Sequence, residues 1–452
     1  MTVLLARWIY SILLMLVAPL AWAWLFWRQR KSQTHWAVLA AERFGYYSQP
    51  WDGPAPIWIH AVSVGETRAA APLIQTLLLK GETVLLTHLT PTGRAEGQRL
   101  LAQDIHEGRV RQQWMPYDFS GAMHRFVKHF EPRIALLIER EVWPNLVHHA
   151  ALADIPVVLV SARFSERSLK QTLWINRLFA GLLHDTYAKL ELALAQTEED
   201  AQRLFESGVP EVTVSGNLKF DLDLPVVAVQ AGEHWRERLQ RPVIAIASTR
   251  EGEDRQFATL IAQQLKKHPS DDTPLFILIP RHPQRFDEAA RLLDEEKLRY
   301  ARWSVLRDDP QSDAALSKLD VVLGDTMGEM PFFYGVADVA IVAGSFENHG
   351  GQNFIECCAT GTPVIVGPHT RNFAHAVESA LHVGAIAQVQ NAEQALNQAT
   401  DWLIQADSHQ QAHQIGLAGK AWVASHVGAT ARIMQAISAL EDGPETPSRP
   451  LD

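Results

Sequence analysis

The chain has 452 residues, 47% of them hydrophobic and 20% charged, and a formal net charge of −10 at pH 7. This composition excludes a largely disordered chain, and the length exceeds one ordinary hydrophobic core, which predicts two domains. A negative charge with no long basic run beyond the N-terminus argues against a nucleic-acid partner. The only cysteines, Cys357 and Cys358, are neighbours, which favours a reducing compartment over a disulfide framework.

The N-terminal segment differs from the rest of the chain. Residues 8–27 carry no formal charge, and a helix of this length spans a bilayer of ~30 Å. Aromatic residues stand at both ends, and the basic residues Arg28, Arg30 and Lys31 follow, a bias that places the downstream body on the cytoplasmic side. We therefore expect residues 1–31 to form an uncleaved membrane anchor with a basic flank, and not a cleaved signal peptide. A helix lying in the interface plane is the alternative arrangement.

From residue 56 onward, short apolar runs alternate with helical patterns. Such alternation predicts parallel sheets that are covered by helices on both faces, which places the chain in the α/β class. The predicted strands of the first series are 57–62, 83–86, 134–138, 157–160, 192–195 and 212–215. Those of the second series are 243–247, 275–279, 321–323, 339–342, 363–366 and 385–389.

A break in this rhythm divides the two series. Residues 221–241, flanked by prolines, fit neither pattern and are the predicted linker. The predicted domains are therefore 32–220 and 242–440, each a doubly wound, Rossmann-like fold, with a cleft between them. The remaining residues, 441–452, are rich in proline and acidic side chains, which predicts a disordered tail.

Glu66 lies where the first predicted strand meets a helix. The strand 57–62 runs into Ser63-Val64-Gly65-Glu66, and a helical pattern follows. In an open α/β sheet, ligands bind at this edge, outside the carboxyl ends of the strands. A glutamate there can be a general base, or a helix N-terminal charge that the macrodipole favours. The residues alone leave both interpretations open.

Other strand ends of the first domain also carry polar side chains. Glu139 and a second glutamate flank an arginine after the strand 134–138. A functional pair of carboxylates and a structural salt-bridged cluster explain this pattern equally well. Lys219 stands just before the linker and can offset the charge of a phosphate or carboxylate, or it can be a solvated surface lysine. Residues 90–93 (TPTG) form either an ordinary turn or a loop that offers N–H groups to a ligand.

The second domain has three loops that suit an anionic or nucleotide ligand. Pro280 and Arg281 follow the strand 275–279, and glycine-punctuated stretches at 324–330 and 350–356 each lead into a helix. The dinucleotide fingerprint and the Walker loop are absent, which disfavours NAD and P-loop chemistry. No spacing of His, Cys and Asp suggests a catalytic metal.

Taken together and in order, these motifs resemble one family. HAVSVGET, TPTG, ERE-x-WPN, SAR-x-S, GNLKFD, PRHPxRF, GDTMGEM and GGxNxxE are similar to the 3-deoxy-D-manno-octulosonic acid (Kdo) transferases of lipopolysaccharide assembly. The resemblance runs over nearly the whole chain, from about residue 1 to about residue 430. One departure is Gln352, where the family often has histidine.

The resemblance implies a GT-B glycosyltransferase of the bacterial inner membrane, with the body on the cytoplasmic side. Its reaction would move Kdo from CMP-Kdo to the lipid A precursor lipid IVA, with inversion and with neither a metal nor another cofactor. By the same resemblance, Glu66 is the general base, and Glu139 and Lys219 support the transition state. The residues that match the CMP-binding loops are Pro280, Arg281, Met327, Gly328, Glu329, Asn353, Phe354, Ile355 and Glu356, of which Glu356 would hold the ribose.

Two other functions fit the same motifs. One is a membrane-anchored GT-B enzyme that uses another nucleotide sugar. The other is a non-catalytic protein that binds a nucleotide sugar at the membrane surface. Turnover of CMP-Kdo, and competition between CMP and UDP, separate these possibilities from the Kdo transferase.

Overall fold

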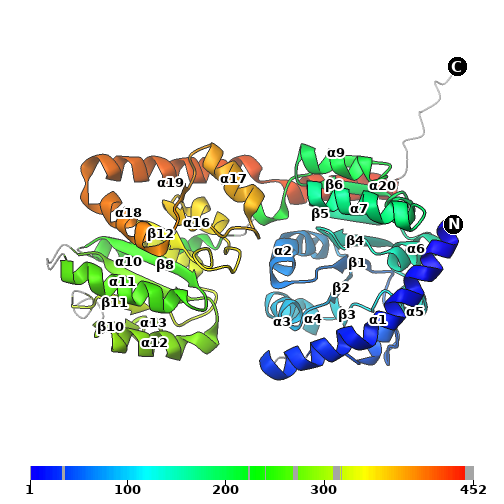
Figure 1. Ribbon diagram of the computed structural model, residues 1–452, viewed down its shortest axis with the longest axis horizontal. Helices are drawn as coiled ribbons and strands as arrows, with labels where there is room; N and C mark the ends of the chain where they lie inside the picture. The colour runs from blue at the N-terminus through cyan, green and yellow to red at the C-terminus, as the bar shows by residue number, and fades with distance from the viewer. Residues whose placement is uncertain are drawn as a thin grey trace, which may run out of the picture. The chain divides into compact units, whose positions relative to one another are not determined.

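The computed structural model describes residues 2–32, 36–221, 224–239, 241–267, 273–308, 316 and 318–442. It contains two compact units. Unit 1 comprises residues 1–222 and 426–452, and unit 2 comprises residues 223–425. Each unit is built on a parallel sheet of seven strands, as the alternating pattern predicts (Figure 1).

The sheet of unit 1 has the order β3-β2-β1-β4-β5-β6-β7. Side chains alternate between its two faces, so that Ile57 and Ile59 of β1 enter one hydrophobic core while Trp58 enters the other. The strands are β1 (Ile57–His60), β2 (Val84–His88), β3 (Val110–Trp114), β4 (Ile134–Ile138), β5 (Val157–Ala162), β6 (Leu192–Ala195) and β7 (Val212–Val214).

Helices cover both faces of this sheet (Figure 1). α2 and α20 bury apolar side chains in one core, and α5, α6 and α9 bury theirs in the other. The helical elements are α1 (Val3–Ser32), η1 (Ala41–Phe44), α2 (Val64–Leu79), α3 (Pro91–Leu100), α4 (Ala102–His106), α5 (Ser120–Phe130), α6 (Pro144–Leu152), α7 (Glu166–Leu178), α8 (Leu182–Tyr187), α9 (Glu198–Glu206), η2 (Leu218–Phe220) and α20 (Ala429–Asp442).

The sheet of unit 2 has the order β10-β11-β9-β8-β12-β13-β14. Its strands are β8 (Val243–Thr249), β9 (Leu275–Pro280), β10 (Tyr300–Arg302), β11 (Val321–Leu323), β12 (Val339–Val342), β13 (Val364–Val366) and β14 (Ala387–Gln388). Its helical elements are α10 (Val226–Arg238), α11 (Glu253–Lys267), η3 (Pro283–Arg285), α12 (Phe286–Glu295), α13 (Trp303–Leu306), α15 (Met330–Val336), α16 (Ile355–Thr360), α17 (Ala374–His382), α18 (Ala392–Ile404) and α19 (Ala406–His426).

Two strands, β3 and β10, are absent from the predicted series. Both are the first strand in the order of their sheets, so each has a sheet partner on one side only. Their sequences, VRQQW and YAR, carry polar residues that such an edge position tolerates. Sequence alternation therefore finds the buried central strands and misses these two polar edge strands, although it finds the edge strands β7 and β14.

The unit boundaries differ from the predicted ones. The predicted linker 221–241 contains α10, which packs on α15 of unit 2 through a close glycine contact: a Cβ on Gly232 would lie 2.2 Å from the carbonyl oxygen of Phe332. The predicted second domain, 242–440, loses its last helix, α20, whose Ile433 is buried in the core of unit 1. Residues 443–452 of the predicted tail lie outside the described residues.

α1 is a continuous helix of 30 residues. By length and composition it is able to cross a membrane, since its candidate span Val3–Arg30 has a mean hydropathy of 2.0 and only 11% of that window is buried. It runs along the outside of unit 1, beside α5 and α6 (Figure 1).

Candidate functional site

Glu66 lies in the first turn of α2, at the carboxyl end of the central strand β1. Ser63 caps the helix, and its Oγ accepts a hydrogen bond from the backbone N–H of Glu66 at 3.4 Å. In return, the Glu66 carboxylate accepts bonds from the Val62 N–H at 2.7 Å and from the Ser63 hydroxyl at 3.1 Å. This reciprocal arrangement is close to a capping box. The interpretation of Glu66 as a helix N-terminal charge therefore describes its local geometry.

The ionisation of Glu66 points to the other interpretation. Burial raises the pKa of its carboxyl to about 7, and the negative charge of Glu139 adds to this rise. The hydrogen bonds from Val62 and Ser63 oppose the rise, because they favour the ionised form. A carboxyl that titrates near neutral pH is suited to proton transfer. Glu66 is thus both a capping residue and a poised acid–base group.

Glu139 follows β4 at the same sheet edge, because strands β1 and β4 are parallel neighbours. Its backbone has a φ of 64°, in the left-handed region that non-glycine residues rarely adopt. The Glu139 N–H donates to the Val160 carbonyl at 3.0 Å. Its carboxylate accepts a bond of 2.6 Å from the Lys219 ammonium. The structure therefore joins two of the predicted site residues in one ion pair. Residues with a strained backbone, as at Glu139, occur often at functional sites.

Lys219 lies in η2, and the loops around it fix its position. The Asn217 side chain accepts from the Lys219 N–H at 2.9 Å and donates to Gln196 at 3.0 Å. Ser161, at the end of β5, accepts from the Leu218 N–H at 3.3 Å. The SAR and GNLKFD motifs thus act as supports that hold the lysine beside Glu139.

Glu141, which sequence reasoning did not select, completes the group of carboxylates. Burial raises the pKa of this carboxyl too, and its charge contributes to the raised pKa of Glu66. Its carboxylate accepts from the indole N–H of Trp143 at 3.1 Å. The second glutamate of the ERE motif was the signal available in the sequence.

The buried histidine of the HAVSVGE motif lies beneath this group. The Trp143 ring packs edge-on against the imidazole of His60 at 5.6 Å. His60 Nδ1 lies 2.9 Å from the Thr87 hydroxyl, and burial lowers the pKa of the ring to about 3. The histidine is therefore neutral at physiological pH and serves to pack the loop after β4 onto the sheet.

The TPTG loop supports the turn that carries Glu66. Thr90 caps α3 by accepting the Gly93 N–H at 3.1 Å, and its hydroxyl donates to the Val62 carbonyl at 2.7 Å. A Cβ at Gly93 would lie only 2.9 Å from that carbonyl oxygen, so the close approach requires glycine. The loop is a structural support, which is the simpler of the two predicted interpretations.

In unit 2, Arg281 follows β9 and Glu356 lies in the first turn of α16. Burial raises the pKa of the Tyr334 phenol well above its usual range, the charge of Glu356 adds to this rise and the charge of Arg281 opposes it. β9 and β12 both flank β8 in the parallel sheet, so the loop that carries Arg281 and the segment after β12 that leads to Glu356 lie at the same carboxyl-end edge. A carboxylate and a guanidinium at this edge suit hydroxyl and phosphate groups.

The stretch Asn353–Glu356 is held by its own side chains. Asn353 donates to the Glu356 carboxylate at 3.0 Å and accepts the Ile355 N–H at 3.1 Å. Phe354 and Ile355 are almost fully buried. Their side chains belong to the core, so only their backbone is available to a ligand.

The loop from Met327 to Glu329 follows β11. Met327 is 50% exposed, and Gly328 has a φ of 87° with open space around its Cα. The Glu329 carboxylate accepts from the indole of Trp303 at 3.1 Å. A mobile apolar side chain beside a bare glycine can cover the face of a planar ring.

Glu253 is a structural determinant that sequence reasoning missed. This fully buried carboxylate accepts four backbone N–H groups, from Gly344 at 2.6 Å, Phe346 at 2.9 Å, Glu347 at 3.2 Å and Arg250 at 2.9 Å. It therefore fixes the loop after β12 to the loop after β8. In the sequence it resembles an ordinary acidic residue in the first turn of a helix.

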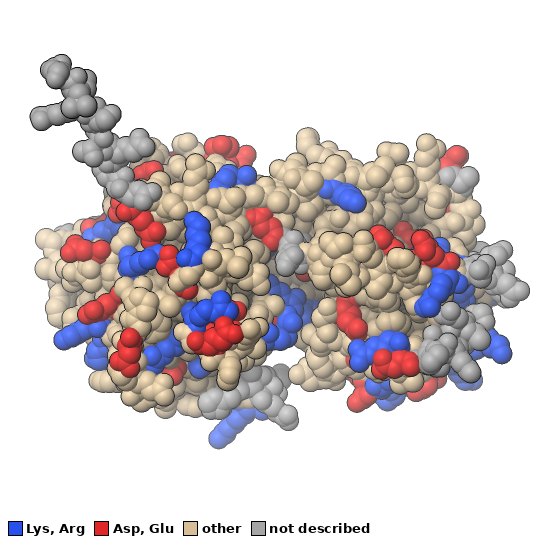
Figure 2. Space-filling model, turned by 180° about the vertical axis from the view of Figure 1, so that it is seen from behind, with Lys and Arg blue, Asp and Glu red and all other residues tan. Residues whose placement is uncertain are grey.

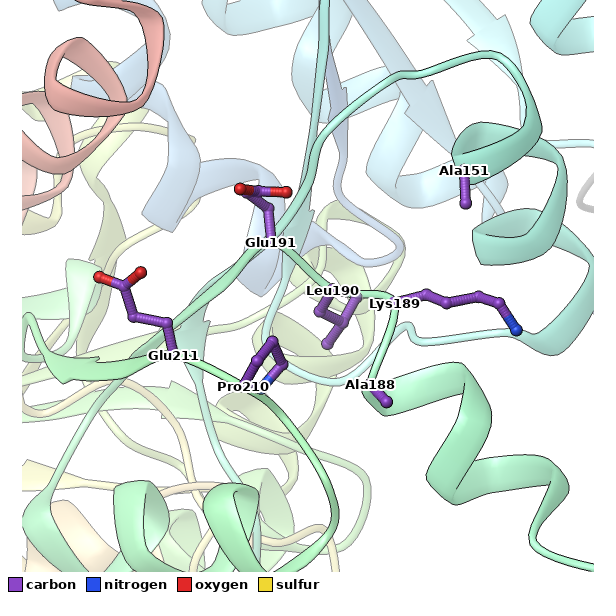
Figure 3. Close-up of a pocket in the computed structure, with 7 residues that line it drawn as sticks. All are labelled: Ala151, Ala188, Lys189, Leu190, Glu191, Pro210 and Glu211. Carbon is purple, nitrogen blue, oxygen red and sulfur yellow. The ribbon is translucent and has the colours of Figure 1, made fainter. Parts of the chain in front are cut away.

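A hollow of about 490 Å³ on unit 1 lies away from these residues (Figure 3). It is lined by Ala151, Ala188, Lys189, Leu190, Glu191, Pro210 and Glu211. Glu191 and Glu211 directly precede β6 and β7, so the hollow is at the amino ends of the strands, opposite the edge that carries Glu66. We place the candidate site at the carboxyl-end edge, because the polar groups converge there.

On the face that Figure 2 shows, Lys and Arg side chains lie among Asp and Glu side chains (Figure 2). Within the described parts of the chain, no group of three or more His, Cys, Asp or Glu side chains is placed to hold a metal ion.

Comparisons with known proteins point to one family. A family model described as 3-deoxy-D-manno-octulosonic-acid transferase (kdotransferase) matches residues 39–222. A 3-deoxy-D-manno-octulosonic acid transferase of Bordetella pertussis is 48% identical over 434 residues, which cover 95% of this chain and 98% of that protein. The protein of the same name from Haemophilus influenzae is 31% identical over 435 residues, 95% of this chain and 97% of that protein.

A solved structure also resembles the fold. The UDP-GlcNAc 2-epimerase from Neisseria meningitidis, bound to UDP-GlcNAc, superimposes with a TM-score of 0.53. The match covers 85% of this chain and 99% of that chain at 17% identity, so it concerns the fold alone. With the two parallel seven-stranded sheets, it confirms the predicted GT-B class.

Proposed function

The chain belongs to the family of 3-deoxy-D-manno-octulosonic acid (Kdo) transferases and is therefore a glycosyltransferase, and from this premise we propose that it moves Kdo from CMP-Kdo to lipid IVA, a lipid A precursor, with inversion at the anomeric carbon. The relationship extends over 95% of the chain in both relatives. In this proposal, unit 1 binds the glycolipid acceptor and unit 2 binds the nucleotide-sugar donor.

Glu66 is the general base of the proposed reaction. The acceptor hydroxyl gives its proton to the Glu66 carboxylate while its oxygen bonds to the anomeric carbon of Kdo. The bond from that carbon to the CMP phosphate breaks, and its electron pair stays with the phosphate. The observation that carries this role is the pKa of Glu66, which burial and the charge of Glu139 raise to about 7. A base with this pKa balances ionisation and proton affinity at neutral pH.

The ion pair of Glu139 and Lys219 supports the transition state. Its 2.6 Å contact fixes the Lys219 ammonium beside Glu139, whose own charge acts on Glu66. A fixed positive charge stabilises negative charge that develops on the reacting groups without reorganisation. The left-handed backbone conformation of Glu139 is strained, and this strain is the energetic cost of holding its carboxylate at this position.

The loops of unit 2 bind the CMP part of the donor. Arg281 contacts the phosphate, and Glu356 accepts hydrogen bonds from the ribose hydroxyls. Pro280 and Asn353 shape the two loops from which these side chains project. The stretch Met327–Glu329 covers the cytosine ring of CMP, and the backbone of Phe354 and Ile355 completes the site. The positions of these residues after β9 and β12 support this assignment, because both strands flank β8 and their carboxyl ends lie at one edge.

The apolar helix α1 holds the enzyme at the cytoplasmic face of the bacterial inner membrane. Its length, its hydropathy and the arginines that follow support this localisation. The proposed acceptor carries acyl chains and is itself a membrane lipid, so an enzyme attached to the same surface encounters it by diffusion along the membrane.

Mass spectrometry of the reaction products tests the proposed function. Full-length protein is incubated with CMP-Kdo and lipid IVA, and a product whose mass has grown by one or more Kdo groups is expected. A matched reaction replaces CMP-Kdo by a UDP-sugar and should leave lipid IVA unchanged. Absence of product at saturating CMP-Kdo, or transfer from the UDP-sugar, would contradict the proposal. The first of these results would favour a binding protein, the second another GT-B enzyme.

A further inference from the structure

α1 presents one stripe of side chains to the body of unit 1. Buried and half-buried residues are spread around the first turns of the helix, and from Ser11 onward they recur at intervals of three and four, which marks one face. The stripe consists of Arg7, Ser11, Leu14, Ala18, Trp22, Leu25 and Gln29. Because it runs almost from end to end, the helix contacts the body along its length and not only at one end.

Polar hydrogen bonds fix the first half of the helix. The Tyr10 hydroxyl donates to the Asp118 carboxylate at 2.9 Å, and the Asn145 side-chain amide donates to the Ser11 hydroxyl at 3.1 Å. Asp118 and Asn145 are themselves joined, since Asp118 accepts the Asn145 N–H at 3.1 Å. These bonds give a polar contact in the middle of a segment that is otherwise apolar.

Aromatic and amide contacts fix the second half. The Trp22 ring lies 5.6 Å from Phe44, with Tyr117 and Phe119 close by at 5.9 Å and 6.4 Å. Near the end of the helix, Gln29 accepts the backbone N–H of Trp36 at 3.0 Å.

The length of this contact region is incompatible with a membrane span in this arrangement. At a rise of ~1.5 Å per residue, the segment from Tyr10 to Gln29 extends over roughly 28 Å. The hydrocarbon core of a bilayer is ~30 Å thick. If α1 crossed it, the loops that carry Asp118 and Asn145 would have to enter the hydrocarbon as well, where irregular backbone and a carboxyl group find no water.

Apolar side chains are exposed over most of α1, Leu4, Met15 and Val17 among them, and the face opposite the body is one part of this apolar surface. The large side chains of that face recur at intervals of three and four, and each is at least 51% exposed. They are Leu5, Trp8, Ile12, Leu16, Leu20, Trp24 and Trp27. The exposed Arg28 and Arg30 follow this face directly. Tryptophan side chains and a basic end are typical of positions at a lipid–water interface.

We propose that α1 lies in the plane of the membrane interface, with this outer stripe in the lipid and the body of unit 1 held beneath it by the Asp118 and Asn145 contacts. The occupant of the exposed face is thus the cytoplasmic leaflet of an anionic phospholipid bilayer.

This arrangement places the lipid surface beside the candidate site of unit 1. Asp118 follows β3 and Asn145 follows β4, at the carboxyl-end edge that also carries Glu66 and Glu139. A helix docked on that edge brings the head groups of the leaflet to the acceptor side of the site. Only this consequence rests on the proposed function; the orientation of α1 does not.

Sidedness of labelling tests the orientation directly. Thr2 is exposed at the start of α1, Glu107 is exposed on unit 1, and both native cysteines are buried. Inverted inner-membrane vesicles that contain full-length Thr2→Cys or Glu107→Cys are treated with a membrane-impermeant maleimide, and the unmodified chain reports the background. We expect Thr2→Cys to react to the same extent as Glu107→Cys. Reaction of Thr2→Cys only after detergent opens the vesicles would overturn the proposal.

Depth measurements give a second, independent readout. Nitroxide labels at Leu5→Cys, Ile12→Cys and Leu20→Cys, in vesicles of phosphatidylethanolamine and phosphatidylglycerol, report access to oxygen and to a polar relaxation agent. We expect equal, shallow depths of about 5–10 Å for all three. In a span, Leu20 and Ile12 would both lie deep in the hydrocarbon and Leu5 near its surface, so depths that increase from Leu5 to Leu20 would overturn the proposal. Transfer activity is not measured, so either result is independent of the proposed reaction.

Discussion

Each unit is built on its own parallel seven-stranded sheet, but the carboxyl-end edges of the two sheets carry different charged groups. In unit 1, the carboxyl-end edge carries Glu66, Glu139 and Glu141, and burial raises the pKa values of Glu66 and Glu141. In unit 2, the buried carboxylate of Glu253 accepts four backbone N–H groups, and Arg281 and Glu356 are charged residues at the carboxyl-end edge. Two parallel seven-stranded sheets that differ in strand order therefore carry different charged groups at their carboxyl-end edges.

Part of this difference lies in whether a carboxylate receives enough hydrogen bonds. Glu66 accepts one backbone N–H and one hydroxyl, too few to offset its burial and its acidic neighbours. Glu253 accepts four N–H groups and organises a loop instead. The local supply of donors thus decides between a reactive and a structural carboxylate.

The largest expected effect is that of Glu66→Gln. The amide keeps the acceptor for the Val62 N–H but does not accept a proton from substrate, so kcat should fall by about 10²–10⁴-fold. Binding of CMP, measured by calorimetry, should stay unchanged because the nucleotide loops are in unit 2. Ser63→Ala is the matched control, since it removes the cap and keeps the carboxylate. A Glu66→Gln variant with nearly full activity would contradict the base assignment.

In unit 2, the corresponding test is Glu253→Ala. Four buried N–H groups lose their acceptor, at a cost of about 3 kcal/mol or more in the stability of the unit. CMP binding should weaken strongly, and thermal unfolding should begin at a lower temperature. Glu347→Gln, an exposed neighbour, should change neither quantity. Normal CMP affinity in Glu253→Ala would show that the loop does not depend on this carboxylate.

A smaller effect is expected from Arg281→Met. Loss of one charge-assisted hydrogen bond to phosphate weakens binding by about 1.5–3 kcal/mol, or roughly 10–100-fold in the Kd of CMP. The affinity for cytidine, which has no phosphate, should hardly change. Equal losses for CMP and cytidine would mean that Arg281 supports the fold of the loop and does not contact the phosphate.

The most subtle test is Glu139→Gln. The negative charge of Glu139 raises the pKa of Glu66, so its removal should lower that pKa. The acid limb of the pH–rate profile would then move to lower pH, while Glu66 stays ionised over a wider range. Lys219→Met should move the limb in the opposite direction, because it removes a positive charge. Profiles that coincide with that of the wild type would remove Glu139 from the electrostatics of the site.

The sequence predicts the central part of this structure well. The apolar runs of β1, β4, β8 and β9 are found because buried parallel strands have few polar residues to interrupt the pattern. The polar edge strands β3 and β10 escape, since an edge strand need not be apolar. The sequence pattern does not predict α10, because a glycine and a preceding proline are typical of a linker. In the structure, Gly232 allows close packing of α10 on α15.

The candidate site is predictable to a different degree. Glu66, Glu139 and Lys219 follow from motifs, and the structure shows two of them in one ion pair. The raised pKa of Glu66 cannot be read from a motif, because it results from the burial of the carboxyl and from charges distant in the chain. The structural role of Glu253 cannot be predicted from the sequence for a similar reason, because its four hydrogen-bond donors come from two separate loops.

The pH dependence of kcat/KM for Kdo transfer tests the central claim most directly. A general base acts only when it is ionised, so with the pKa of Glu66 raised to about 7 the rate should rise with pH up to about 7 and then level off. Glu66→Gln should lack this limb at its lower rate. A wild-type profile that is flat from about pH 5 to about pH 9, or a limb that persists in Glu66→Gln, would contradict the account.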